Sequence, residues 1–543
     1  MVTTSRLRRV KLLTRPTRTR PLALFVAPVV FLVALVPYWL TLSPTISWRN
    51  GGIDSGELVT AMLVLGNPHP TGYPLYMLLG KLFTFLPFGE PAWRVDLMSA
   101  CFAALAVALI AVGAARLAIR LTGDEFTPLQ SSQPARVAAQ RRQIRTLAAG
   151  AAGALVFAFS PLLWTRATIA KEYTLNVFVL ALAILFLIVW RDRRQDRLLF
   201  GYAITSGIGL GNHLTSLSLV PGAVLFLLLV DPSLLRRPRL ILSMAGAAAV
   251  GLLSYVYLPL RASQHPFLNW GDPSNWHNFY DHVSGAVYRG VLFQSGFTGS
   301  VQRFIYTIQD LPRQFGWLGV VCLIVGIWVI ARRDRPFAAL AGSLAAITLT
   351  FAAVFPVLES EAYVLPAHLA ASFAVGIGFD RIAAEVTWLA TFNWRWPDAR
   401  VLATVVGAAV ILPAMSLIAN HAGVDLHTNY FARDYAVAIL TAAEPHAVVL
   451  TDHEEETFSL WYAQGALHLR PDVVVIDDRL TGWPWYRSNL AAWYPDLGLN
   501  GPSPQSEQRL LTGKVPGRAV DRAQTPDFSA DRLPSPLIKH VAP

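Results

Sequence analysis

Two acidic residues and a histidine near the N-terminus have the types and spacing that proton transfer to and from a hydroxyl needs. Asp54 and Glu57 stand three residues apart in the segment GGIDSGELVTAMLVLGNPHPTGYP (51–74), and His69 follows in its proline- and glycine-rich turn. A carboxylate within hydrogen-bond reach of a hydroxyl can take its proton while the oxygen attacks an electrophile. The segment therefore offers Asp54 as a candidate general base, with Glu57 as second choice or as a residue that positions the acceptor.

The same residues also have an ordinary structural explanation. Asp54 or Ser55 can cap a helix, and Glu57 can complete a capping box in its first turn. His69, beside Pro70, can simply be a turn residue. Against this explanation, the acids follow directly on an apolar run, at a membrane boundary where an unused carboxylate is costly.

The composition indicates an integral membrane protein. Of the 543 residues, 54% are hydrophobic and only 15% are charged, whereas an ordinary soluble domain has about a quarter charged residues. The net charge of +11 does not indicate a nucleic-acid-binding protein, because the basic residues lie in short loops between apolar runs. Cys101 and Cys322 both lie inside apolar runs, so no disulfide framework is expected.

Apolar runs of membrane-crossing length predict about eleven transmembrane helices. We expect them at residues 21–43, 95–118, 146–164, 174–190, 198–212, 213–230, 239–259, 314–331, 336–355, 363–380 and 400–419. The first run is too long for a signal peptide and is expected to be retained. The connections that this assignment places in the cytoplasm are all basic, namely 120–145, 191–197, 231–239, 332–335 and 381–400. The N-terminus is therefore expected in the cytoplasm and the C-terminus outside it.

The chain divides into four predicted regions. Residues 1–20 form a basic cytoplasmic arm, and residues 21–419 form a mainly α-helical transmembrane domain with a first outer loop (44–93) and a large outer loop (261–313). Short apolar stretches in the first loop fit helices lying in the outer interface. Residues 420–495 are expected to form a small extracytoplasmic α/β module, because β-type runs at 447–451 and 473–476 flank a helical pattern at 455–466. The remainder, 496–543, is expected to be poorly ordered.

Several motifs together resemble a known family. The most specific are the segment 51–83, which opens with GGIDSGELVTAM, and LNWGDP (268–273); weaker ones are TIAKEYTLN (168–176), GLGNHLTSL (209–217), EAYVLPAHLA (361–370) and RPDVVVIDDRL (470–480). They are similar to the multi-pass membrane family known as DUF2723, which belongs to the GT-C glycosyltransferases and includes a eukaryotic protein O-mannosyltransferase of the endoplasmic reticulum. One departure from the family pattern is that Lys171 follows Ala170, so that the acid comes next, as Glu172.

The resemblance implies a GT-C-type helical bundle and an inverting transfer of a hexose from a polyprenyl-phosphate-linked donor. Mannose is suggested by the eukaryotic relative, and the acceptor hydroxyl can belong to a protein, a lipid or a glycan. The reaction would take place at the extracytoplasmic face of a membrane, for which a bacterial cytoplasmic membrane is the expected location. No cofactor and no nucleic-acid partner are expected. Such a displacement needs one base, which is Asp54, with Glu57 as the alternative.

Polar residues near the outer helix ends are candidates for binding donor and acceptor. Arg261 is the first candidate to meet the charge of the departing phosphate, with Arg166, Lys171 and His213 behind it. The other candidates for substrate binding are His69, Tyr73, Glu172, Tyr173, Asn269, Trp270, Asp272, Glu361 and Tyr363.

Ordinary roles remain open for several of these candidates. Arg261 can snorkel to lipid headgroups, Trp270 can anchor the chain in the interface, and Glu361 can cap a helix. His213 can hydrogen-bond a helix end. The acidic run DHEEE (452–456) is expected to begin a helix and complement its dipole rather than to bind a metal.

Two other functions are open on the sequence alone. A transporter or flippase could use broken helices and polar residues to line a path, but the candidate residues gather at the outer face rather than the midplane. A noncatalytic membrane scaffold could use the outer α/β module to bind a partner. That function predicts that Asp54 can be replaced without loss.

Overall fold

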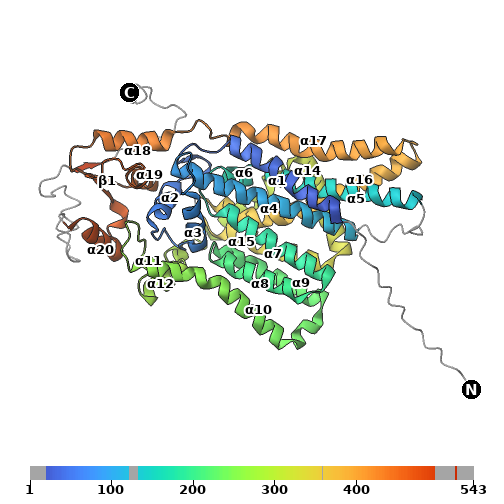
Figure 1. Cartoon of the computed structure of the whole chain (residues 1–543), viewed down its shortest axis with the longest axis horizontal. Coiled ribbons are helices and arrows are strands. Elements are labelled where there is room, and N and C mark those ends of the chain that lie inside the picture. The colour runs from blue at the N-terminus through green and yellow to red at the C-terminus, as the bar shows by residue number, and fades with distance from the viewer. Residues whose placement is uncertain (1–19, 122–132, 358, 496–519, 523–543) are drawn as a thin grey trace, which may run out of the picture.

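The computed structural model describes residues 20–121, 133–357, 359–495 and 520–522. Long helices form a bundle, and a small α/β part with a three-stranded sheet lies at one end of it (Figure 1). The long helices of the bundle are α1 (Arg20–Leu40), α4 (Pro91–Leu121), α5 (Gln133–Ala158), α7 (Tyr173–Arg193), α8 (Asp196–Leu210), α9 (Leu219–Val230), α10 (Pro238–Gly251), α14 (Leu311–Arg333), α15 (Arg335–Val354), α16 (Leu365–Phe392) and α17 (Asp398–Val424).

The chain is a multi-pass membrane protein whose helices follow the predicted spans. In the described part of the chain, seven helices are long and apolar enough to cross a membrane, or eight if α5 and the short α6 (Pro161–Ala167), bent by 69°, form one crossing. Three further predicted spans coincide with shorter helices, namely α1, α8 and α9. Several predicted ends are displaced, since α5 begins as early as Gln133 and α16 and α17 continue to Phe392 and Val424.

Small residues allow the helices at the centre of the bundle to approach closely. Gly326 of α14 lies against the backbone of Ala374 in α16, and Gly378 of α16 lies against the backbone of Cys322 in α14. A Cβ atom at either glycine would collide with a carbonyl oxygen of the other helix. Such small-residue contacts are the usual means by which transmembrane helices pack where the hydrophobic effect cannot drive them together.

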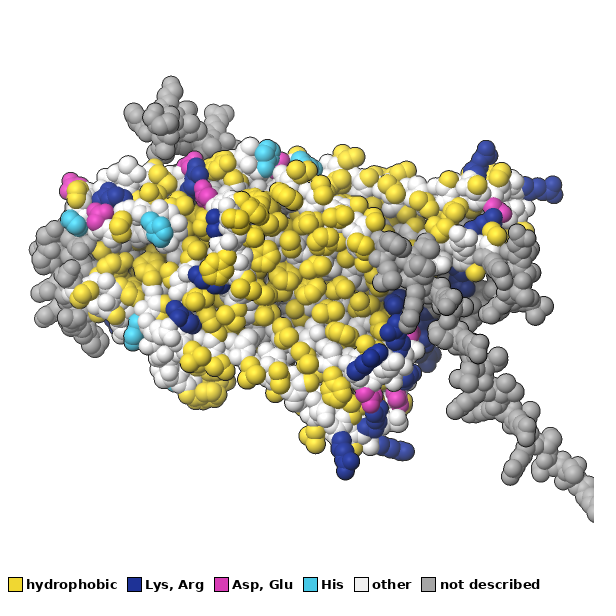
Figure 2. Space-filling model, in the orientation of Figure 1, with side chains coloured by type: hydrophobic (Ala, Val, Ile, Leu, Met, Phe, Trp, Pro, Cys, Tyr) yellow, Lys and Arg dark blue, Asp and Glu magenta, His cyan; other side chains and the backbone are white. Residues whose placement is uncertain are grey.

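The surface of the bundle separates into an apolar middle and a basic end. Figure 2 shows apolar side chains covering the middle of the bundle and Lys and Arg side chains gathered at the end away from the α/β module. At that end Asp192 lies 4.0 Å from Arg116 and 3.7 Å from Arg120. These residues border connections that the sequence assigned to the cytoplasm. The predicted basic arm, 1–20, lies almost entirely outside the described residues.

Short helices connect the spans at the end of the bundle that carries the α/β module. The first outer loop contains η1 (Arg49–Gly51), α2 (Ser55–Val64) and α3 (Pro74–Phe83), as predicted for helices too short to span. The other short elements of the bundle are η2 (Leu214–Ser218), η3 (Pro232–Arg236), η4 (Leu252–Val256), α11 (Tyr257–Ala262), α12 (Trp276–Val283), η5 (Ala286–Val291), α13 (Gly296–Gln309) and η6 (Ser360–Val364). Among these, η3 lies in a connection that the sequence assigned to the cytoplasm.

The predicted β-α-β unit is confirmed. Strand β1 (Val448–Thr451) pairs in parallel with β2 (Val474–Asp477), and α19 (Glu454–Gly465) connects them. The module also contains α18 (Phe431–Ala442), η7 (Asp478–Leu480) and α20 (Pro484–Trp493). A third strand that the sequence did not predict, β3 (Val520–Arg522), pairs with the other edge of β1. Apart from β3, the segment predicted to be poorly ordered lies outside the described residues.

Helix α19 fixes the module to the first outer loop. Leu58 and Met62 of α2 and Phe458 of α19 belong to one buried apolar cluster. Gly56 lies against the backbone of Phe458, so a side chain there would collide with its carbonyl oxygen. The indole of Trp48 donates to Ser459 Oγ over 2.8 Å. The module and the outer loops therefore share a core, which places residues from distant parts of the sequence in one site.

Candidate active site

A cavity of about 270 Å³ lies where the outer loops meet the module. It brings together residues from the first outer loop, the start of α7, the LNWGDP loop, the segment before α16 and the first turns of α19. The lining residues are Ile53, Asp54, His69, Tyr73, Lys171, Glu172, Tyr173, Trp270, Tyr288, Phe355, Val357, Glu359, Tyr363, Glu454 and Phe458.

The two most specific sequence motifs pair with each other at this cavity. Asn67 and Asn269 form an isolated parallel bridge, in which Asn67 N donates to Leu268 O over 2.8 Å and Trp270 N donates to Asn67 O over 3.0 Å. The Asn67 amide also donates to Asn269 Oδ1 over 2.9 Å. This pairing carries the ring of Trp270 to within 6.3 Å of the ring of His69.

A buried lysine lies between two carboxylates of the cavity. Lys171 is 3% exposed, and its ammonium group contacts Asp54 Oδ2 and lies 2.9 Å from Glu359 Oε2. Lys171 occupies the break between α6 and α7, where Ser99 Oγ donates to its carbonyl oxygen over 3.4 Å. The residue that departs from the family pattern therefore supplies the cation that is paired with the candidate base.

Glu57, which does not line the cavity, fixes the position of His69. Its carboxylate is fully buried, accepts from the backbone N of His69 over 2.7 Å and lies 2.5 Å from His69 Nδ1. The other ring nitrogen, Nε2, lies 3.9 Å from Asp54 Oδ2. Asp54 is the N-cap residue of α2 but makes no side-chain capping bond, and Glu57 turns to His69 rather than completing a capping box. The capping explanation thus does not account for either carboxylate.

The charged groups of the cavity shift one another's pKa values. Burial disfavours the charged form of Asp54, but the positive charges of Lys171 and His69 outweigh it and hold the pKa of Asp54 below its usual value. Burial also disfavours protonation of His69, yet Glu57 and Asp54 raise its pKa to about 10. For Lys171, the neighbouring carboxylates Asp54 and Glu359 overcome burial and raise the pKa. Near neutral pH the cavity therefore holds two cations beside an ionised Asp54.

Glu172, another acid of the cavity, lies beside a group of aromatic rings, since its Oε1 atom is 3.8 Å from Nε2 of His213. His213 stacks on Tyr73 at 6.1 Å between ring centroids, and lies 5.5 Å from the ring of Tyr173 and 5.8 Å from that of Tyr363. Glu172 is 2% exposed, and its Oε2 atom is without a hydrogen-bond partner among the described residues. The cavity wall therefore combines aromatic faces with a buried carboxylate.

The sequence candidates divide into those that line the cavity and those that do not. Asp54, His69, Tyr73, Glu172, Tyr173, Trp270 and Tyr363 line it, while Glu57 and His213 support lining residues from behind. Arg261, Asn269, Asp272 and Glu361 are not among the lining residues.

The four residues outside the cavity have structural partners. Arg261 donates to Leu65 O over 2.6 Å and to Val64 O over 3.1 Å, and so caps the C-terminal end of α2. Asn269 donates to Asp272 Oδ1 over 2.9 Å and thereby holds the LNWGDP loop. Glu361 is largely exposed and lies 3.2 Å from the buried guanidinium of Arg166. Their substrate-binding roles stay predictions, and Lys171 and His69 are the cations that the cavity places beside Asp54.

Sequence reasoning missed several lining residues. Glu359 stands two positions before Glu361 in the same segment, so its type and place gave a usable signal. Tyr288 lies in the large outer loop without a distinctive motif. Glu454 and Phe458 belong to an acidic helix start that has an ordinary capping explanation, and only the packing of α19 on α2 brings them to the cavity.

The acidic run at the start of α19 brings three possible metal ligands together. Asp452, His453 and Glu456 place ligand atoms within 4.8 Å of one another. However, Glu456 accepts a hydrogen bond from Tyr435 over 3.2 Å, and His453 pairs with Asp452. Helix α19 begins at Glu454, with three acids in its first turn, which is the arrangement expected for an acidic helix start. We assign no metal to this cluster.

Two domain families match the chain in the regions that build the cavity. Residues 54–235 match the protein O-mannosyl-transferase TMEM260 N-terminal domain, and residues 432–493 match TMEM260-associated domain 2. The chain is therefore similar to the TMEM260 proteins over these two regions. It is 26% identical over 481 residues to protein O-mannosyl-transferase TMEM260 of Mus musculus, covering 83% of this chain and 62% of that protein. The corresponding protein of Dictyostelium discoideum is 22% identical over 509 residues, covering 84% of this chain and 57% of its own length. The chain thus spans about three fifths of the length of these proteins.

Solved structures show the same fold. The crystal structure of ArnT from Cupriavidus metallidurans in the apo state superposes with a TM-score of 0.53 at 16% sequence identity, covering 87% of this chain and 95% of ArnT. The structure of ArnT bound to undecaprenyl phosphate gives a TM-score of 0.50 at 16% identity, covering 86% and 90%. The fold of the GT-C-type bundle that the sequence motifs implied is therefore confirmed.

Proposed function

We propose that this protein transfers a hexose from a polyprenyl-phosphate-linked donor to an acceptor hydroxyl, with Asp54 as the general base. The observation that carries the proposal is the cavity in which the Asp54 carboxylate lies beside two cations, the buried Lys171 and the mostly buried His69, at one end of a membrane bundle. A lipid-linked donor presents its phosphate and anomeric carbon at the membrane interface while its tail stays among the helices. This cavity has the location and the charges that such a donor needs.

The proposed reaction is a single displacement. The acceptor oxygen attacks the anomeric carbon, and the bond from that carbon to the phosphate oxygen breaks with its electron pair staying on the phosphate. Asp54 takes the proton of the acceptor hydroxyl as the new bond forms. Lys171 and His69 stabilise the charge that develops on the leaving phosphate. Because attack and departure occur on opposite faces, the configuration at the anomeric carbon inverts.

Because Asp54 is paired with Lys171, binding of the donor would affect how basic the Asp54 carboxylate is. Before the donor binds, Lys171 keeps the pKa of Asp54 low, which weakens this carboxylate as a base. A phosphate placed beside Lys171 would compete for the same ammonium group. The Asp54 carboxylate would then regain basicity when the donor is in place, so that proton removal follows donor binding.

The relatives support the choice of donor and acceptor. Two of them are named protein O-mannosyl-transferase, which favours mannose as the sugar and a protein hydroxyl as the acceptor. ArnT, which shares the fold, has been solved bound to undecaprenyl phosphate, which favours a polyprenyl phosphate as the carrier. These assignments are proposals for the present chain, because it spans only part of the length of the named relatives.

The distribution of charge supports an extracytoplasmic site. Basic residues gather at the end of the bundle away from the cavity (Figure 2), and the positive-inside rule places such an end in the cytoplasm. We therefore propose that the cavity and the α/β module face the other side of the membrane. The bacterial cytoplasmic membrane stays a prediction.

The experiment is sugar transfer by purified protein in lipid nanodiscs, supplied with radiolabelled polyprenyl-phosphate hexoses and a membrane extract as acceptor source. Asp54→Asn should reduce transfer by about 10²- to 10⁴-fold, the usual contribution of a general base, while donor binding is retained. Asp281→Asn, which changes a partly exposed acid of α12 outside the cavity lining, is the matched control and should transfer normally.

Either of two results would reject part of the proposal. Unchanged transfer by Asp54→Asn would remove Asp54 as the base. If folded wild-type protein transferred sugar from no donor, the enzyme function itself would fail, and the transporter and scaffold functions would take its place.

A further inference from the structure

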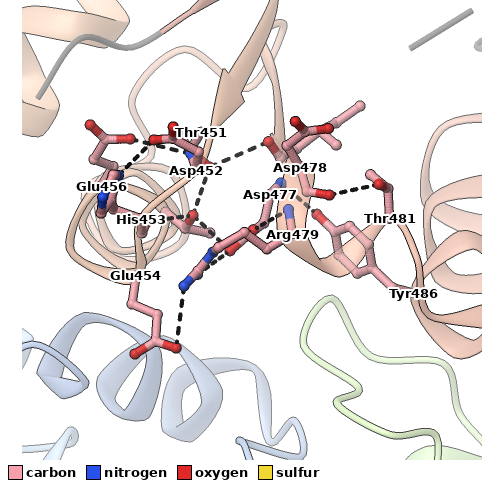
Figure 3. A network of polar contacts seen from close by, with 12 residues as sticks. Thr451, Asp452, His453, Glu454, Glu456, Asp477, Asp478, Arg479, Thr481 and Tyr486 are labelled. Atoms are coloured by element: carbon pink, nitrogen blue, oxygen red, sulfur yellow. Dashed lines mark hydrogen bonds and ion pairs between the residues drawn. The ribbon is translucent and has the colours of Figure 1, made fainter. Parts of the chain in front are cut away.

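The cavity is closed on one side by the α/β module. Glu454 and Phe458, both on α19, line it together with Asp54 and His69 of the first outer loop. Figure 3 shows the Glu454 side chain extending away from the strand ends of the module toward the pale blue helix of the N-terminal region. The module therefore contributes a carboxylate to a site whose other charges come from the membrane domain.

Glu454 is held much less firmly than the other carboxylates of the cavity. Its recorded ion-pair partner is Arg479, at 3.5 Å between Oε1 and Nη1, and the two side chains are 50% and 40% exposed. An ion pair with this exposure contributes little to stability. Arg479 itself is anchored by Asp477, which is fully buried and lies 2.8 Å from Nη2 (Figure 3). The carboxylate of Glu454 can therefore leave Arg479 for a ligand, while Arg479 stays in place.

The acids around the cavity outnumber its cations. Lys171 is paired with Asp54 and Glu359, and His69 is paired with Glu57. Glu454 adds a further negative charge beside these matched groups. Burial and the negative charges of Asp54 and Glu57 raise the pKa of Glu454, and the positive charges of Arg479 and His69 offset this only in part. A positive group brought by a ligand would relieve this repulsion.

We propose that Glu454 is a specificity-determining residue that recognises the charge of the acceptor residues next to the reacting hydroxyl. It favours a polypeptide acceptor whose reacting Ser or Thr has a cationic neighbour, and it disfavours one with an acidic neighbour. This inference rests on the proposed function, in which the acceptor hydroxyl meets Asp54 in the same cavity. A pair of opposite charges about 4 Å apart in a wet site gains about 1 kcal/mol. A cationic neighbour should therefore gain about fivefold in kcat/KM and an acidic neighbour should lose as much, so that the two differ by about 25- to 30-fold.

The experiment uses the full chain in nanodiscs, a radiolabelled polyprenyl-phosphate mannose donor, and two peptides that each contain one Thr, flanked by Lys or by Glu. Wild type should prefer the Lys peptide to the Glu peptide about 25- to 30-fold in kcat/KM. Glu454→Gln should bring the ratio close to one, while the KM for the donor stays unchanged. Glu454→Lys should reverse the preference. Glu455→Gln, in the same helical turn but outside the cavity lining, is the matched control and should keep the wild-type ratio.

Other results would overturn the inference. An unchanged peptide ratio in Glu454→Gln would show that Glu454 does not read acceptor charge. An equal loss of kcat for both peptides would give Glu454 a role in the chemical step instead. Transfer by wild type to glycan or lipid acceptors but to neither peptide would reject the acceptor class and leave the proposed function standing. Absence of transfer to every acceptor in the membrane extract would reject the proposed function itself.

Discussion

The two walls of the cavity are built in different ways. On the membrane-domain side, Lys171, Glu57 and His69 are nearly or mostly buried, and each is paired at short distance with an opposite charge. On the module side, Glu454 and Arg479 are about half exposed and lie 3.5 Å apart. One wall holds its charges in fixed positions, whereas the other presents a charge that a ligand can recruit.

This difference matches the demands of the proposed reaction. Charges that stabilise a departing phosphate are most effective when they are fixed before the reaction, because no reorganisation is then needed. An acceptor-binding wall gains from adaptability, since it must admit a hydroxyl together with its varied surroundings. The following predictions test the contrast, beginning with the largest expected effect.

Removing the buried cation should have the largest effect. Lys171→Met removes the cation that lies between Asp54 and Glu359 and leaves His69 as the cation beside Asp54. Breaking a buried pair of this kind typically costs about 3–5 kcal/mol. Transfer should fall at least about a hundredfold, as for the loss of one charge-stabilising donor, and the protein should melt at a lower temperature. Lys171→Arg should retain part of both properties. Full transfer by the Met variant would contradict the view that the fixed charges on the membrane-domain side of the cavity are needed for the reaction.

The pairing of His69 with Glu57 should give stability a dependence on pH. The pKa of His69 is about 10 in the folded protein and about 6.5 when unfolded. Its stabilising contribution is therefore fully present below pH 6.5 and is lost as the pH rises from 6.5 to about 10. The slope for one proton is about 1.4 kcal/mol per pH unit.

Melting temperatures between pH 6 and pH 10 measure this dependence. Wild type should lose stability across the window, and Glu57→Gln should lose less, because the main cause of the raised pKa is gone. Parallel curves for the two proteins would show that the Glu57–His69 pair is not the source of the pH dependence.

A side chain introduced at Gly56, where α2 of the membrane-domain wall packs on α19 of the module wall, should push the two walls apart. In Gly56→Ala the new methyl group meets the carbonyl oxygen of Phe458, which forces α19 away from α2. Overpacking of this kind typically costs about 1–3 kcal/mol. The KM for the acceptor should rise more than the KM for the donor. Gly407→Ala, on α17 with open space around it, should be neutral or slightly stabilising, and equal effects of both substitutions would argue against the junction.

The smallest effect on sugar transfer is expected at Glu361, the exposed acid that pairs with Arg166. Glu361→Gln removes the largely exposed partner of Arg166, and an exposed pair contributes about 0.2–1 kcal/mol. Transfer should change by less than about fivefold. Glu359→Gln, which removes a carboxylate held 2.9 Å from Lys171, should reduce transfer clearly more. If Glu361→Gln lost more transfer activity than Glu359→Gln, the exposure of the two acids would not determine their importance for transfer.

Much of the fold could be predicted from local sequence. Apolar runs determined where the membrane helices lie, and the alternation of β-type and helical patterns determined the β-α-β unit, because both depend on residues close together in the chain. Strand β3 was missed because its three residues carry no pattern of their own and gain their partner only from β1.

The site was only partly predictable. The motif residues Asp54, His69, Glu172 and Trp270 were expected and line the cavity. Arg261 was ranked above Lys171 as the phosphate-binding cation, because a basic residue at an outer helix end is a recognisable signal. Its position at the end of α2 comes from a capping interaction that no spacing rule reveals.

The sequence by itself determined that this chain spans a membrane, which segments cross it and which acids could perform proton transfer, since hydropathy and motif spacing are local properties. Only the tertiary structure decided which charges pair. Lys171 meets Asp54 because the break between α6 and α7 lies beside the first outer loop. Glu454 joins them because α19 packs on α2. These contacts depend on close packing between segments far apart in the chain, where a side chain's partner is set by neighbours that its own stretch of sequence does not contain.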